Sequence, residues 1–296
     1  MEICLRMDRR NTMRLIALLL AIVFVVLPGT TTARDSKEGL LQDLYGKSGL
    51  EKQIVQLPMV VQAGFDQAAE TDDRLKAMPR NVVGEIRASI RTVFAPENIK
   101  KAILDECREK LSIDDMKEVM EWLDSPLGHR FARLEEAAST PEKYTEMQQF
   151  AQTLQESPPL PERLEIIRRL DDAAKATETS VEVAMNTQLA ITIAVVASLP
   201  KEQQPTYDKL AAVVEQTRPQ IESAMQTQTI ISLLYTYSNV SDAELGRYIG
   251  FASSPTGKIY HEATISGLKK ALLEGSYKWG ESIAEILTNA ANRTEV

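Results

Sequence analysis

The sequence predicts an all-α protein in which two tandem helical-bundle units follow an N-terminal signal helix. Aromatic residues, which favour strands, are only 5% of the 296 residues, whereas helix-forming Ala, Glu, Gln and Leu are abundant. Apolar residues recur at i, i+3, i+4 and i+7, the spacing of one helix face. A block of the first half also returns in the second half at a fixed offset. No segment requires a strand.

The first 33 residues have the pattern of a secretory signal. Arginines precede an unbroken run of 13 apolar residues from Leu15 to Leu27, and small residues lead to an expected cleavage site after Ala33. Such a run rises about 20 Å as a helix, which is less than the roughly 30 Å of a bilayer core. The pattern therefore predicts a periplasmic or secreted protein, and an uncleaved inner-membrane anchor over the same run is the alternative. A start at Met7 or Met13 would shorten only the basic region.

The charge balance argues against nucleic acid as a partner. The whole chain has a net charge of −8, and residues 34–296 hold 30 basic and 40 acidic side chains. A field of this sign repels phosphate backbones and anionic lipid heads. We therefore expect membrane contact only through the signal segment before it is cleaved.

Two blocks of sequence recur along the chain. Ser112–Gly128 returns as Ser241–Gly257 at an offset of 129, with the same serines, proline and glycine and the same apolar helix face. Val55–Gln62 resembles Val181–Gln188 at an offset of 126. The small difference between the two offsets would fall in a loop, where it is tolerated.

The repeat predicts where the units begin and end. We expect unit 1 over residues 40–156 and unit 2 over residues 163–292, joined by a proline-rich linker over residues 157–162 that cannot continue a helix. The apolar segment from Val181 to Leu199 is interrupted by polar residues, so we predict a central buried helix rather than a membrane span. Ser139, two residues before a proline, predicts a further helix start.

Each copy of the longer block contains a Ser-Pro-x-Gly element, which predicts a corner between two helices. Proline suits the first turn of the new helix, the serine can cap it, and glycine allows a close backbone approach. An aromatic residue lies on each side of the element, so a ring contact across each bend is expected. The predicted corner residues are Trp122, Ser125, Pro126, Gly128 and Phe131 in the first copy and Phe251, Ser254, Pro255, Gly257 and Tyr260 in the second. We interpret them as structural, and contact with a ligand is the alternative.

These corners carry a family resemblance. An acidic helix start, an amphipathic helix with an aromatic residue near its end and the Ser-Pro-x-Gly element resemble the bacterial family catalogued as domain of unknown function 2059. The similar stretches are Asp115–His129 and Glu244–Lys258. The resemblance implies an exported helical protein and no catalytic residues. The Leu-Asp pair after Trp122 departs from the family's aromatic-rich helix end.

Residue types that commonly bind metals or carry catalysis form no recognisable motif. The two histidines, His129 and His261, lie at non-equivalent repeat positions and are interpreted as partly exposed on helix surfaces. Cys107, the single cysteine after the signal, lies on an apolar stripe and is expected to be buried and inert. The sequence therefore predicts no cofactor, no metal ion, no catalytic residues and a protein that is not an enzyme.

The sequence favours a non-catalytic binding or interaction protein of the cell envelope. Two helical units with methionine-rich apolar faces suit an adaptable groove for a protein, peptide or lipid partner. A self-associating structural protein of the envelope, or an enzyme of unidentified class, is the alternative.

Overall fold

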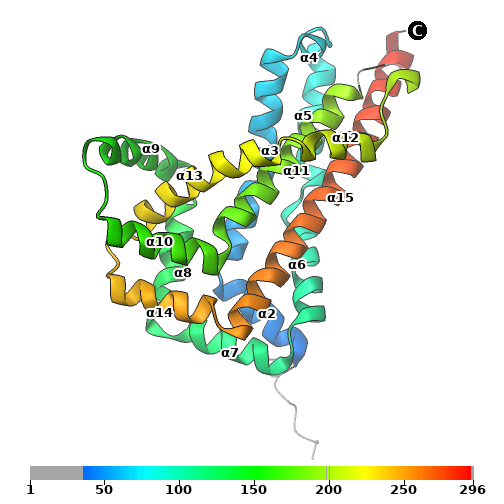
Figure 1. The fold of residues 1–296 in the computed structure, drawn as a ribbon. Helices are drawn as coiled ribbons and strands as arrows, with labels where there is room; N and C mark the ends of the chain where they lie inside the picture. Colours follow the sequence, from blue (N-terminus) through cyan, green and yellow to red (C-terminus); the bar gives the residue numbers. More distant parts are fainter. Residues whose placement is uncertain (1–35, 198, 200, 295–296) are drawn as a thin grey trace, which may run out of the picture.

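A computed structural model describes residues 36–294 except 198 and 200, and every regular element in these ranges is helical (Figure 1). The all-α class is therefore confirmed. The predicted signal segment and its cleavage site lie outside the described residues.

The helices follow the chain in a simple order. In the first half they are α2 (Lys37–Lys47), α3 (Leu50–Thr71), α4 (Asp73–Lys76), α5 (Arg80–Val93), α6 (Pro96–Lys110), α7 (Ile113–Asp124), α8 (Pro126–Ala138) and α9 (Pro141–Glu156). In the second half they are α10 (Pro161–Ala174), α11 (Ala176–Val196), the 3-10 helix η2 (Lys201–Gln203), α12 (Tyr207–Glu215), α13 (Arg218–Thr236), α14 (Asp242–Ala252) and α15 (Pro255–Thr294). Residues 157–160, within the predicted linker, are not helical.

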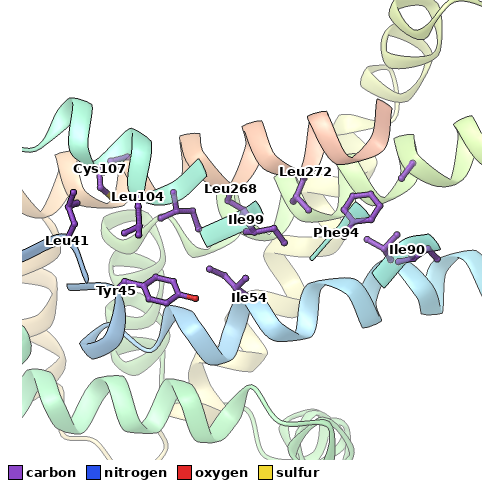
Figure 2. Packing of buried hydrophobic residues seen from close by; sticks show 14 of the residues in the cluster. Leu41, Tyr45, Ile54, Ile90, Phe94, Ile99, Leu104, Cys107, Leu268 and Leu272 are labelled. Atoms are coloured by element: carbon purple, nitrogen blue, oxygen red, sulfur yellow. The ribbon is translucent and has the colours of Figure 1, made fainter. Parts of the chain in front are cut away.

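The 40-residue helix α15 joins the two halves of the chain. It packs against α5 and α6 of the first half and against α11 of the second (Figure 1). The largest hydrophobic cluster includes residues of α2, α3, α5, α6, α7 and α15. Figure 2 shows Phe94 and Ile99 beside Leu268 and Leu272 within this cluster. The two predicted units thus share a core.

Two features of α15 bring it close to its neighbours. Gly267 faces the backbone of α6, where a Cβ atom would lie 2.7 Å from the Ala102 carbonyl oxygen and 2.8 Å from the Ile103 nitrogen. Farther along, the ring of Trp279 is fully buried and its indole N–H donates to Ser89 Oγ at 2.9 Å. The absence of a side chain at Gly267 therefore lets two helices cross almost backbone to backbone.

Helix α11 is the apolar segment expected at the centre of the fold. It contacts α3, α12, α13 and α15. Its buried Glu182 lies 3.3 Å from both Arg218 and Lys269, which compensate its charge. Within the described residues α11 alone is long and apolar enough to cross a membrane by length and composition. Its contacts on several sides suit a helix of a protein core equally well.

The two Ser-Pro-x-Gly corners have the same local geometry. Ser125 Oγ accepts a hydrogen bond from the Gly128 N–H at 3.0 Å, and Ser254 Oγ accepts one from Gly257 at 3.0 Å. A Cβ atom at either glycine would overlap a carbonyl oxygen of the preceding helix, that of Trp122 or Phe251. Each corner therefore requires its glycine.

Further local features recur at matching positions. Helices α7 and α14, which precede the corners, both begin with a capping box, formed by Ser112 with Asp115 and by Ser241 with Glu244. The only positive φ angles of the described residues are at Gly49 and Lys175, directly before α3 and α11. These two residues are separated by 126 positions, the offset of the shorter repeat.

The predicted helix start at Ser139 is wrong by one residue. Ser139 ends α8, and its hydroxyl donates to the Glu135 carbonyl oxygen at 2.7 Å. Thr140 precedes α9 instead and makes no side-chain cap. The residue before a proline is pushed into the extended region, and Thr140, with ψ of 151°, takes that conformation.

Candidate functional site

A cavity of about 500 Å³ lies between helices of the two halves. Helices α3, α7, α8 and α9 contribute to its wall from the first half, and α10, α11, α13, α14 and α15 from the second. The volume falls within the roughly 300–1,000 Å³ of small-molecule sites. Gln228 of its lining is exposed, which places an opening of the cavity on the outer side of α13.

Aromatic rings from both corners form one wall. Trp122 stacks on Phe251 with ring centroids 4.9 Å apart, and on Tyr248 at 5.5 Å. The predicted ring contact across the first corner is present, with Trp122 and Phe131 6.3 Å apart. At the second corner the prediction is wrong: in the described part of the chain no ring contact joins Phe251 to Tyr260. Phe251 packs on the indole of the other corner instead, so the aromatic residues connect the corners to each other.

Glu135 places a carboxyl group in this aromatic surrounding. Its Oε1 atom accepts hydrogen bonds from the Tyr237 hydroxyl at 2.6 Å and from the Tyr248 hydroxyl at 3.1 Å. Burial raises the pKa of Glu135, while the two tyrosine hydrogen bonds oppose that rise. Burial, followed by the nearby carboxylate, raises the pKa of both tyrosines well above its usual value. The tyrosines therefore stay protonated and act as fixed donors to the carboxyl group.

His261 on α15 lines the same cavity. Its Nε2 atom is buried and has no hydrogen-bond partner among the described residues. Burial, and next the charge of Lys175, lower the pKa of His261 to about 4, so the imidazole is neutral near pH 7. His129 is exposed and His261 is partly exposed, as the sequence predicts, but the prediction missed that the Nε2 atom of His261 is buried at the cavity. The helical period of α15 places His261 on the face toward the cavity. The cavity forms only where the second half of the chain packs against the first, so the sequence around His261 does not reveal this position.

A third part of the wall carries hydroxyl and amide groups. They belong to Thr179 and Ser180 of α11 and to Gln228, Thr229, Ser232 and Thr236 of α13. The Thr229 hydroxyl donates to Ser180 Oγ at 3.3 Å. The cavity thus presents an aromatic side, a polar uncharged side and one carboxyl group.

The predicted corner residues divide into two groups. Ser125, Pro126, Ser254, Pro255 and Gly257 lie at the bends and outside the cavity lining, whereas Trp122, Gly128, Phe131, Phe251 and Tyr260 are part of it. The structural interpretation suits the first group. The second group, aromatic except for Gly128, has the position that the alternative of ligand contact requires.

Sequence reasoning missed Glu135, Tyr237, Tyr248 and His261. A usable signal existed for Glu135, because it lies four residues after buried Phe131 and therefore on the inward face of α8. Nothing in the local sequence indicates that the two tyrosines of the second half meet it.

Cys107 is not part of the cavity lining and lies in the core around α15. It is fully buried, as predicted, and burial raises the pKa of its thiol to about 11. The described residues contain no cluster of three or more His, Cys, Asp or Glu side chains that could hold a metal ion.

Comparison of the chain with known protein families, with curated proteins and with solved structures finds no match in any of the three. The resemblance of the corners to domain of unknown function 2059 therefore stays a prediction.

Proposed function

We propose that this chain is a non-catalytic binding protein of the cell envelope that holds a small ligand in the cavity between two copies of a helical unit. The observation that carries the proposal is a cavity whose lining includes six aromatic rings and His261, the Nε2 atom of which is buried without a hydrogen-bond partner among the described residues. Sites of this kind bury an apolar ligand body and orient it with a few polar contacts.

Binding is favoured over catalysis by the arrangement of the titratable groups. Apart from tyrosines, Glu135 and His261 are the titratable side chains of the lining, and no hydrogen bond joins them. Acid–base or nucleophilic catalysis usually places such groups within hydrogen-bond reach of one another. Glu135 is instead held by two tyrosine hydroxyls, which suits a fixed recognition group.

The duplication is supported by which residues meet at the cavity. Several positions that the proposed repeat makes equivalent line the cavity in pairs. At an offset of 129 the pairs are Trp122 with Phe251, Phe131 with Tyr260, Ala132 with His261 and Glu135 with Thr264; at an offset of 126 they are Ser48 with Ala174, Leu50 with Ala176 and Gln53 with Thr179. A binding site formed by both copies of the helical unit would explain why one chain contains two copies.

The binding role is tested by what the protein retains on purification. The full-length chain and its Ser232→Phe variant, which places a ring in the cavity wall, would be compared by native mass spectrometry and by analysis of extracted small molecules. Ser223→Phe, at an exposed position of the same helix outside the lining, is the matched control. We expect a bound compound in the unmodified protein and the control that is lost in Ser232→Phe. The same compounds in all three proteins, or none in any, would contradict the proposal.

Export is tested separately by intact mass. The proposed location in the cell envelope predicts a soluble extracytoplasmic protein whose mass corresponds to cleavage near Ala33. A full-length mass recovered with the inner membrane would favour the uncleaved anchor over Leu15–Leu27 and contradict export.

A further inference from the structure

The charged groups of the cavity have one sign. Glu135 is a carboxylic acid, His261 is neutral near pH 7, and no lysine or arginine belongs to the lining among the described residues. Lys175, the basic residue that influences His261, forms an ion pair with Glu178 at 2.9 Å. The cavity therefore holds an acidic group that no basic side chain compensates, which is costly while the group is ionised and which a cationic ligand would offset.

One oxygen of this carboxyl group is free for a ligand. Both tyrosine hydroxyls donate to Oε1. Oε2 receives no hydrogen bond from the described residues and is not among the buried atoms without a partner, so it is not fully buried, and Glu135 belongs to the cavity lining. Two fixed donors on Oε1 leave Oε2 as an acceptor with a defined direction.

The aromatic wall attracts positive charge as well. Six rings line the cavity, those of Trp122, Phe131, Tyr237, Tyr248, Phe251 and Tyr260. The face of an aromatic ring is electron-rich and attracts an ammonium group, most strongly at tryptophan and where water is excluded. Six electron-rich rings around one carboxyl group make the cavity poorly suited to an anionic ligand.

Resting on the binding function proposed above, we propose that the ligand is an organic amine: a protonated amino group that donates to Glu135 Oε2, attached to an apolar body that packs against the rings. The ammonium group replaces the missing basic partner of Glu135. Its remaining N–H groups can reach acceptors such as the hydroxyls of α11 and α13, which lie on the same cavity.

The test uses two series of matched probes, each of which keeps one apolar body and changes the polar head group from cationic to neutral to anionic. Tryptamine, tryptophol and indole-3-propionate share an aromatic body, and hexylamine, hexanol and heptanoate share an aliphatic one. Each would be titrated by calorimetry into the full chain, into Glu135→Gln and into the control Glu136→Gln. Glu136 is the next residue of α8, lies outside the lining and pairs with Lys52.

We expect the amine of at least one series to bind at least about tenfold more tightly than its alcohol, as for one charged hydrogen bond. Glu135→Gln should remove that preference, and Glu136→Gln should retain it. Equal binding of an alcohol or acid, a preference that survives in Glu135→Gln, or no binding of either amine would overturn the inference. If an alcohol or acid binds and Ser232→Phe abolishes that binding, the cavity remains a ligand site and only the amine class is wrong. Thermal unfolding of each variant checks that it is folded.

Discussion

The crossing of α6 and α15 makes a sharp prediction for Gly267→Ala. A Cβ atom there would lie 2.7 Å from the Ala102 carbonyl oxygen and 2.8 Å from the Ile103 nitrogen, and both are backbone atoms that cannot rotate away. Restoring ordinary contact distances of about 3.5–4 Å requires the helices to separate by roughly 1 Å. Such overpacking costs about 1–3 kcal/mol, against a gain of about 0.5–1 kcal/mol from replacing glycine by alanine in a helix. We expect a net loss of about 1–2 kcal/mol.

The matched control is Gly246→Ala on α14. A Cβ atom at Gly246 meets nothing within 4 Å, so the variant should gain about 0.5–1 kcal/mol from helix propensity alone. Urea unfolding followed by circular dichroism at 222 nm gives both free energies, with the slope checked for two-state behaviour. The reasoning fails if Gly267→Ala is as stable as the unmodified protein, or if both variants shift in the same direction.

Three further predictions concern other parts of the molecule. Trp279→Ala should cost about 3–5 kcal/mol in urea unfolding, because it removes a fully buried ring that contacts Phe65; a loss below about 1 kcal/mol would show that the site is not packed as described. The lowered pKa of His261 favours the folded state above the unfolded pKa of 6.5, and this contribution is lost as the pH falls toward about 4. Between pH 6.5 and 4, His261→Gln should therefore lose less stability than the unmodified protein, whereas a slope like that of the unmodified protein would argue against burial. Ser112→Ala and Ser241→Ala should each cost about 1 kcal/mol, and a clear effect at one position alone would contradict equivalent capping boxes.

The elements most accessible from sequence are those set by local chemistry. The corners are an example, since the requirements of proline, a capping serine and a glycine act within a few residues of Ser125 or Ser254. The buried position of Cys107 also follows from its own helix, because its neighbours at helical spacing are apolar. Periodicity alone is enough to predict these features.

The cavity could not be predicted in the same way because it depends on contacts between distant segments. Glu135 meets Tyr237 and Tyr248 across more than 100 positions of the chain. A glutamate on the inward face of α8 is compatible with an ion pair, a cap or a binding group until those partners are known. His261 shows the same limit, because the face of α15 on which it lies borders a cavity only once the first half of the chain packs against that helix.

The proposed duplication also offers a reason why the molecule has an open cavity on one side and a closed core on the other, and this leads to a final prediction. Gly267 of α15 corresponds to Ala138, the last residue of α8, and Ile103 of α6 corresponds to Ser232 of α13. On one side the pair is in backbone contact, and on the other both residues line the cavity. Ala138→Leu should therefore change stability by less than about 1 kcal/mol, because its side chain extends into open space. Gly267→Leu should lose at least about 3 kcal/mol in the same urea experiment, because it forces a larger side chain into a backbone crossing. Equal losses at the two positions would mean that α8 and α13 are packed as closely as α15 and α6, and the explanation of the cavity would be wrong.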